Sequence, residues 1–208
     1  MASDAADPGK PIGRRVILGM AGLGAAGILV GSKVQGWIND VMTPVQAADP
    51  TGLTQLLPAA GGFRIYTITG DLPGKSPEAW RLTVNGMVDH PMTLTLDDLK
   101  AMPPTSLVRD FQCVTGWRVP GVHWTGVRLG YLLDMAGVQA EGVALKFHSF
   151  DGADTESLTL EQAHLPDVIV AYEMLGAPVT RDHGGPVRLY VAPMYGYKSL
   201  KWLDGIEV

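Results

Sequence analysis

The stretch Asp110-Phe111-Gln112-Cys113-Val114-Thr115-Gly116-Trp117 contains the only cysteine among the 208 residues of this chain. Small and aromatic residues surround the thiol on both sides. Because a lone cysteine cannot form an intrachain disulfide, three roles are open to it: an inert buried side chain, a nucleophile, or a soft ligand to a metal. Each role predicts different partners elsewhere in the chain.

The composition indicates one globular domain that does not bind nucleic acid. The chain has 26 glycines, 15 prolines and 18% charged residues, which favours turns and short strands over long helices. Its formal net charge is −5, and no lysine-rich run or basic stripe is present, so the sequence argues against nucleic acid as a partner. A domain of roughly 150 to 160 residues is large enough to bury a core without disulfides.

The N-terminus is typical of an exported protein. Gly13-Arg14-Arg15 precedes an uncharged stretch, rich in glycine and alanine, that ends near Ser32. We therefore predict a twin-arginine signal or membrane anchor over 1–34, a linker over 35–62 and the folded domain over 63–208. The apolar run 16–30 is short for a membrane span, which needs about 20 residues, so cleavage and retention are both open. Either outcome places the protein in the periplasm or on the outer face of the cytoplasmic membrane.

The pattern of apolar residues predicts an α+β domain, because strands and short helices mix without strict βαβ alternation. Strands are expected over 63–68, 80–84, 145–150, 168–172, 187–191 and 206–208. Helices are expected over 96–100 with Thr95 as the N-cap, over 127–136 with Gly137 as the stop, and over 158–164.

The rest of the chain restricts the chemistry of Cys113 without deciding it. Five histidines, at positions 90, 123, 148, 164 and 183, offer a base for a cysteine hydrolase, but none lies in a recognisable local signature. Zinc and iron–sulfur sites need about four protein ligands, commonly several cysteines. A metal held mainly by an organic dithiolene needs only one protein sulfur. The inert, nucleophilic and ligand roles all stay open on this reasoning.

Two segments near the C-terminus offer anchors for an anionic cofactor. In His183-Gly184-Gly185-Pro186-Val187-Arg188, two glycines allow close approach of a ligand between a histidine and an arginine. The segment 195–202 adds the donors that a phosphate prefers, which are Lys198, Ser199 and Lys201. Composition alone also fits a glycine-rich turn beside a surface lysine pair.

Together with Phe111-Gln112-Cys113-Val114-Thr115-Gly116-Trp117, Trp124-x-Gly126-Val127-x-Leu129 and Ala171-Tyr172-Glu173-Met174, these segments resemble the molybdopterin domain of the sulfite oxidase family. The resemblance runs in the family's order from about Tyr66 to Val208. It implies a sulfite-oxidase-type fold and a molybdenum cofactor with a single dithiolene pterin, in which Cys113 is the protein ligand to the metal. It further implies a set of residues that hold the pterin and its phosphate, namely His183, Arg188, Lys198, Ser199 and Lys201, with Tyr66 and His123 as additional candidates.

Departures from the family bear on the substrate. Sulfite oxidases carry Gly-Asn-Arg after the cysteine and an active-site tyrosine before Ser-x-Pro, whereas this chain has Arg118 as the candidate anion-binding arginine and Asp154-Thr155-Glu156-Ser157 in the tyrosine region. The tryptophan four residues after the cysteine makes this segment resemble that of the exported bacterial reductases that repair methionine sulfoxide in proteins. The resemblance therefore implies oxygen-atom transfer, with S-oxides or similar compounds as substrates and Cys113 and Arg118 as the catalytic residues.

The resemblance also implies partners and two alternative functions. The chain carries no fused haem domain and no further domain after Val208, so we expect a membrane haem or quinone protein as electron partner and no homodimer of the sulfite oxidase type. One alternative is a sulfite-oxidase-like enzyme. The other is a membrane-tethered structural or electron-relay subunit of a respiratory assembly that uses the same fold. Copurification with cytochrome subunits, without turnover of any substrate, would indicate the latter.

Overall fold

The computed structural model describes residues 63–65, 67–114 and 117–208. The predicted signal or anchor, the predicted linker and Tyr66 lie outside these residues. Within the described part, no helix is both long and apolar enough to cross a membrane.

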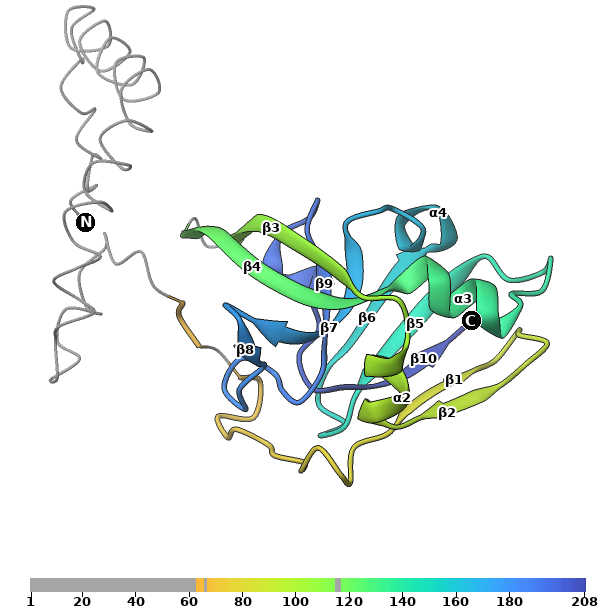
Figure 1. Ribbon diagram of the computed structural model, residues 1–208, viewed down its shortest axis with the longest axis horizontal. Coiled ribbons are helices and arrows are strands. Elements are labelled where there is room, and N and C mark those ends of the chain that lie inside the picture. The colour runs from red at the N-terminus through yellow and green to blue at the C-terminus, as the bar shows by residue number, and fades with distance from the viewer. Residues whose placement is uncertain (1–62, 66, 115–116) are drawn as a thin grey trace, which may run out of the picture. The chain divides into compact units, whose positions relative to one another are not determined.

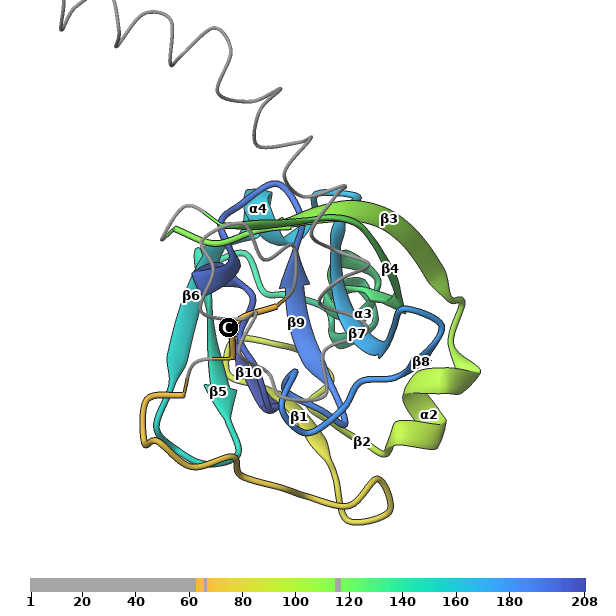
Figure 2. The same cartoon turned by 90° about the vertical axis from the view of Figure 1, so that its left-hand side faces the viewer.

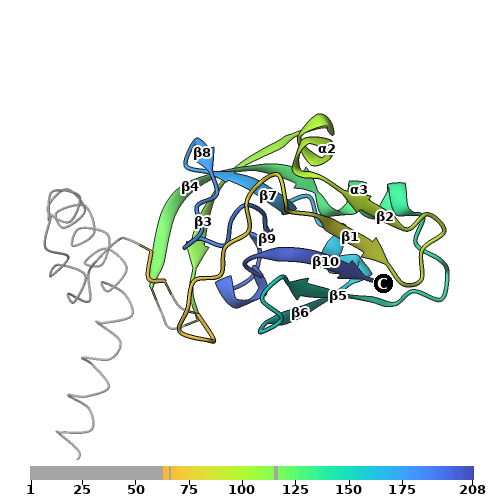
Figure 3. The ribbon, with the colours of Figure 1, turned by 90° about the horizontal axis from the view of Figure 1, so that it is seen from below.

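The first of two sheets has five strands in the order β2-β1-β10-β5-β6. Strands β1 and β10 run parallel, and the other neighbours are antiparallel. Figure 3 shows β1, β10, β5 and β6 side by side, seen from below. The strands are β1 (Leu82–Asn85), β2 (Met92–Leu94), β5 (Ala144–Ser149), β6 (Thr155–Thr159) and β10 (Leu203–Glu207).

The second sheet is antiparallel in the order β3-β4-β7-β8. Strand β9 pairs with residues 168–171 of β7, on the edge opposite β4. The long hairpin of β3 and β4 extends over one end of the molecule (Figures 1 and 2). The strands are β3 (Thr105–Gln112), β4 (Arg118–Arg128), β7 (Val168–Met174), β8 (Ala177–Pro178) and β9 (Arg188–Val191). The described residues thus form mixed sheets with few short helices, as expected for an α+β fold.

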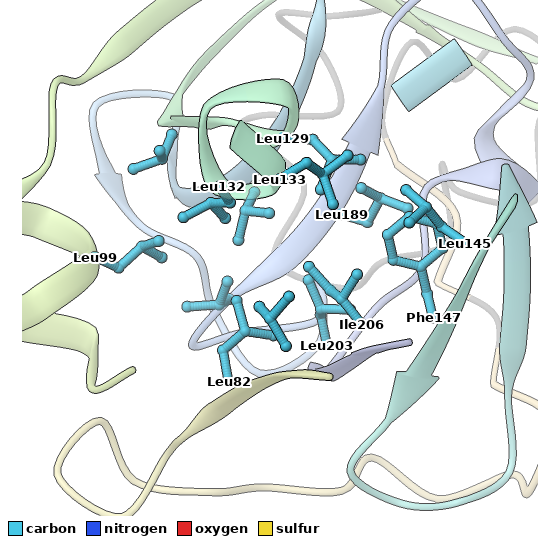
Figure 4. Close-up of a cluster of buried hydrophobic side chains, with 14 of the residues drawn as sticks. Leu82, Leu99, Leu129, Leu132, Leu133, Leu145, Phe147, Leu189, Leu203 and Ile206 are labelled. Atoms are coloured by element: carbon cyan, nitrogen blue, oxygen red, sulfur yellow. The ribbon is translucent and has the colours of Figure 1, made fainter. Parts of the chain in front are cut away.

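The main hydrophobic core joins the first sheet to β9 and to two helices, α2 (Leu96–Ala101) and α3 (Leu129–Ala136). Figure 4 shows Leu99, Leu133, Phe147 and Leu189 converging from four different elements. Burial of each such side chain contributes about 1.5–3 kcal/mol. This packing fixes the position of β9, the strand that begins with Arg188.

A smaller aromatic cluster lies against the second sheet. Because side chains alternate along a strand, Leu189 of β9 enters the main core, whereas Tyr190 enters this second cluster with Phe111 and Trp124. The rings of Trp124 and Tyr190 stack with centroids 4.3 Å apart. The cluster forms a rigid apolar wall beside the start of β9.

The predicted N-cap Thr95 and the predicted stop at Gly137 are confirmed, but the helix expected over 127–136 begins only at Leu129, because positions 127 and 128 belong to β4. Thr95 caps α2 in a capping box, because its hydroxyl accepts from the Asp98 N–H at 3.1 Å and its own N–H donates to the Asp98 carboxylate at 2.9 Å. Helix α3 ends at Gly137, whose φ of 65° is the left-handed conformation that glycine tolerates. The predicted strands near 80–84, 145–150, 168–172, 187–191 and 206–208 correspond to β1, β5, β7, β9 and β10.

Two predicted elements are wrong. No strand forms in the described part of 63–68, because Phe63 packs its ring against the side chains of Phe111 and His183 at centroid distances of 5.3 and 4.7 Å instead of pairing in a sheet. The helix predicted over 158–164 is shorter: Leu158 belongs to β6, and α4 covers only Leu160–Ala163. Its N-cap Thr159 accepts from Gln162 N–H at 3.2 Å, and this cap sets where the helix begins.

Candidate functional site

Cys113 lies in the connection between β3 and β4, directly after the last residue of β3. Its backbone N–H donates to the carbonyl of Trp117 at 2.9 Å, and its side chain is half-buried. The hairpin therefore presents the thiol at the end of the second sheet, beside the aromatic cluster.

A cavity of about 290 Å³ brings Cys113 together with segments distant in sequence. The walls come from the N-terminal segment of the described domain, the β3–β4 connection, the β5–β6 connection and the two C-terminal loops. The lining residues include Arg64, Cys113, Trp117, Asp154, His183, Arg188, Ser199 and Lys201. Of the residues predicted to hold a cofactor, the structure thus gathers His183, Arg188, Ser199 and Lys201 around the thiol.

Arg188 holds the two C-terminal loops together. Its guanidinium donates to the carbonyl of His183 at 2.7 Å and to the carbonyl of Ser199 at 2.7 Å. The cation also lies over the rings of Phe111 and Trp124, at 5.6 and 5.4 Å from their centroids. Burial lowers the pKa of Arg188 to about 10, still well above neutral pH, so the side chain remains charged.

The two loops meet closely because of Gly184. Its φ is +96°, and a Cβ atom there would lie 2.5 Å from the Cβ of Lys201. Only glycine allows this approach without displacement of the lysine. The backbone N–H of Trp202 then donates to the Gly184 carbonyl at 2.9 Å, which fixes Lys201 beside the loop that carries His183.

The basic groups in this cavity are close enough to disfavour one another's charge. Burial and, to a smaller extent, the nearby charge of Arg188 lower the pKa of Lys201 to about 8, against the opposing charges of Asp182, Asp154 and Asp151. Burial also lowers the pKa of His183, and both Arg188 and Lys201 add to that effect. A bound anion would relieve this repulsion, so the site is electrostatically suited to an anionic ligand.

Two donors in the cavity wall are available to a ligand. The Nε of Arg64 and the Nε1 of Trp117 are buried, and neither has a hydrogen-bond partner among the described residues. A buried donor without a partner costs about 1–3 kcal/mol. A ligand rich in oxygen and nitrogen acceptors would satisfy both donors, and a pterin with a phosphate tail is such a ligand. The residues present therefore fit a molybdopterin.

Carboxylates also line the cavity, and two of them stabilise turns. Asp182 accepts from the Thr180 hydroxyl and from the His183 N–H at 3.1 Å, and the Thr180 hydrogen bond lowers its pKa. Asp151 accepts from the Ser149 hydroxyl and from the Ala153 N–H at 3.1 Å. Asp154 also lines the cavity, from the β5–β6 connection.

Three predicted site residues lie elsewhere in the described structure. Lys198 is outside the cavity lining, and its ammonium group donates to the Glu156 carboxylate at 2.6 Å. Arg118 is exposed and forms an ion pair with Asp110 at 3.3 Å. His123 is exposed on β4 between two buried residues and lines a separate groove beside Leu175.

Sequence reasoning did not identify Arg64 or Asp154 as site residues. Arg64 belongs to a run whose alternation indicated a strand, so its side chain was not assigned to a site. Asp154 stands in the segment compared with the tyrosine region of sulfite oxidases, but that comparison gave its carboxyl group no role. Trp117 was recognised as part of the cysteine segment, but nothing in the segment indicates that its indole N–H lacks a partner.

Comparison with known proteins finds a matching family and several relatives of this chain. The sequence pattern of the family described as "Oxidoreductase molybdopterin binding domain" matches residues 69–208. The uncharacterized oxidoreductase YuiH of Bacillus subtilis (strain 168) is 39% identical over 140 residues, which are 67% of this chain and 70% of that protein.

Two further comparisons extend the similarity. The protein-methionine-sulfoxide reductase catalytic subunit MsrP of Ralstonia nicotianae is 27% identical over 220 residues, covering 90% of this chain and 66% of that one. The crystal structure of the sulfane dehydrogenase SoxCD from Paracoccus pantotrophus matches with a TM-score of 0.60 and 26% identity, over 65% of this chain and 39% of that chain. The fold is therefore similar to that of a sulfur-compound oxidoreductase.

Proposed function

This chain belongs to the oxidoreductase molybdopterin-binding domain family, the sulfite oxidase family, and from that membership we propose that it reduces S-oxides or similar compounds by oxygen-atom transfer. The enzyme class and the cofactor follow from the family: the chain is a molybdopterin-dependent oxidoreductase. The reductive direction is supported by the similarity to MsrP, which is named for the reduction of methionine sulfoxide in proteins.

One observation carries the assignment of the site. A single cavity brings the lone thiol of Cys113 together with His183, Arg188 and Lys201, although these three residues lie about 70 to 90 positions after Cys113 in the sequence. A thiolate is a ligand for soft metals, and clustered cations bind phosphate. An inert buried cysteine has no need of such a basic cluster.

The residues of the cavity have separate roles in this proposal. Cys113 is the protein ligand to the metal, and the ammonium group of Lys201 neutralises the anionic tail of the cofactor. The unpartnered N–H groups of Arg64 and Trp117 donate to acceptors of the ligand. When bound, the cofactor supplies the redox-active molybdenum centre at which an oxygen atom and two electrons are exchanged.

Arg188, Lys198 and Lys201 have different roles in this proposal. The guanidinium of Arg188 donates to two backbone carbonyls, so its main role is to position the loops that carry His183 and Ser199. Lys198 pairs with Glu156 and lies outside the cavity lining, whereas Lys201 and Ser199 line the cavity of Cys113. We therefore assign phosphate binding to Lys201 in preference to Lys198, with the Ser199 hydroxyl beside it.

A donor assay tests the proposed function. Purified, molybdenum-loaded protein would be supplied with reduced viologen and a panel of S-oxides and N-oxides, and separately with sulfite and an electron acceptor. We expect turnover of S-oxides. The likeness to a sulfane dehydrogenase favours oxidation as the second candidate, and activity with sulfite alone would contradict the reductive assignment.

Export and the electron partner are part of the same proposal. The paired residues Arg14 and Arg15 support export by the twin-arginine route after the cofactor is inserted. An anchor over 16–30 would hold the enzyme beside a membrane haem or quinone protein that supplies electrons. Mass spectrometry of the mature N-terminus tests the anchor: a protein that begins after residue 34 would exclude it.

A further inference from the structure

Asp154 lines the cavity from the β5–β6 connection, where its backbone is hydrogen-bonded to Ser149. Its N–H donates to the Ser149 hydroxyl at 3.1 Å, and its carbonyl accepts from the Ser149 N–H at 3.2 Å. Ser149 is buried, with 4% of its surface exposed, and lies at the end of β5. The backbone of Asp154 is therefore rigidly held where its residue lines the same cavity as Cys113.

The surroundings of Asp154 favour its neutral, protonated form. Burial raises the pKa of the Asp154 carboxyl, and the negative charges of Glu156 and Asp151 raise it further. The Thr155 N–H and the charge of Lys201 act in the opposite direction. An anionic cofactor beside Lys201 would weaken that opposing effect.

Reduction of an S-oxide needs such a group. In R₂SO + 2e⁻ + 2H⁺ → R₂S + H₂O, the sulfur–oxygen bond breaks, the sulfur is reduced and the oxygen leaves as water. The two electrons come from the external donor, which is reduced viologen in the assay. The protons must reach the departing oxygen in the cavity, and a positioned acid accelerates such a transfer by about 10²–10⁴-fold.

On the basis of the proposed function, we propose that Asp154 is a catalytic residue that hydrogen-bonds the oxygen of a neutral S-oxide and donates one of the two protons to it. Solvent supplies the second proton and reprotonates the carboxylate after each turnover. The assignment also names the substrate class. The protonated carboxyl donates to a neutral, polar S–O group, and once it ionises, above its pKa, it repels oxyanions such as sulfite.

The test uses Asp154→Asn and Asp154→Glu in the full-length, molybdenum-loaded protein, with dimethyl sulfoxide as substrate and reduced viologen as donor. For the wild type we expect kcat/KM to fall as pH rises through the pKa of the carboxyl, because the protonated form is the active one. Asp154→Asn should lower kcat/KM by about 100-fold and abolish this pH dependence. Asp154→Glu should restore at least a tenth of the activity and move the pH midpoint.

Asp97→Asn is the matched control. It removes the same charge from an exposed position in the first turn of α2, away from the cavity, and should leave kcat/KM and its pH profile unchanged. Sulfate inhibition is a second measurement, since Asp154→Asn should bind sulfate at least tenfold more tightly than the wild type above the carboxyl pKa.

The outcomes separate this inference from the proposed function. An active wild type whose pH profile is unchanged in Asp154→Asn overturns the role of Asp154 alone. If Asp154→Asn does not load molybdenum, Asp154→Glu provides the test. A pH midpoint of kcat/KM in Asp154→Glu that equals that of the wild type overturns the inference. A molybdenum-loaded wild type without activity on any S-oxide overturns the proposed function and the inference together.

Discussion

Replacement of Arg188 by methionine tests whether this arginine positions the cofactor loops or serves only as a positive charge. Methionine has a similar length but donates no hydrogen bonds. The change would leave the carbonyls of His183 and Ser199, each now bonded at 2.7 Å, without the guanidinium donor. It would also remove the cation from the faces of Phe111 and Trp124.

The magnitude follows from these contacts. Each buried acceptor left without a partner costs about 1–3 kcal/mol, so the two carbonyls together cost about 2–6 kcal/mol. Removal of a buried charge returns part of this cost, because burial already disfavours the charged guanidinium, as its lowered pKa shows. We therefore expect a loss of about 3 kcal/mol in the free energy of unfolding, a large part of the 5–15 kcal/mol typical of a domain.

Urea unfolding followed by tryptophan fluorescence measures this loss, and molybdenum content measures its effect on the cofactor. Arg188→Lys should also be destabilised, because an ammonium group cannot reproduce the planar fork that spans the two carbonyls. Arg118→Met is the control for stability, since its exposed ion pair with Asp110 contributes no more than about 1 kcal/mol. If Arg188→Met unfolds within about 0.5 kcal/mol of the wild type, the positioning role is wrong.

Three further predictions concern the loops around Arg188. Lys201→Met should lower molybdenum and pterin content several-fold, whereas Lys198→Met should leave both near the wild-type level; equal losses in the two variants would contradict the assignment of phosphate binding to Lys201. Because the folded-state pKa of Lys201, about 8, lies below its ordinary value of 10.5, the folded state binds fewer protons than the unfolded state between these values. In cofactor-free protein, the stability of the wild type relative to Lys201→Met should therefore rise as pH increases from 8 to 10, and a constant difference would refute this pKa. Gly184→Ala should lower the free energy of unfolding by more than about 1 kcal/mol, because alanine is strained at a φ of +96° and its Cβ would displace Lys201; unchanged stability and unchanged cofactor content would contradict the close approach of the two loops.

Local signals predicted the helices and several strands of the fold. The capping box of Thr95 and the stop at Gly137 depend on a few neighbouring residues, and the apolar run 168–172 forms the first five residues of β7, all of them buried. The long hairpin was not predicted, because β4 contains Pro120 and β3 carries Arg109 and Asp110, which do not alternate as in a half-buried strand. The register also shifts between Arg109 and Phe111, which breaks the period of two.

The site could be predicted only through the resemblance to a family. Nothing in the sequence indicates that the loop of Gly184 approaches Lys201 or that Asp154 reaches the cavity of Cys113, since these contacts join distant segments. The two lysines of the last loop look equivalent in the sequence. In the structure, Lys198 lies in the 3-10 turn Gly196–Lys198 and pairs with the carboxylate of Glu156. The sequence does not predict this pairing, because it joins distant segments.

Metal and pterin analysis of the full-length protein tests the central claim most directly. Protein purified from a molybdenum-replete host should contain about one molybdenum and one molybdopterin per chain, and Cys113→Ala should lose the metal while it still folds. Thiol reagents should label Cys113 slowly in the loaded wild type, because the sulfur is bound to the metal. A wild type that contains neither molybdenum nor pterin in stoichiometric amounts, with a Cys113 that reacts at once, would contradict the account.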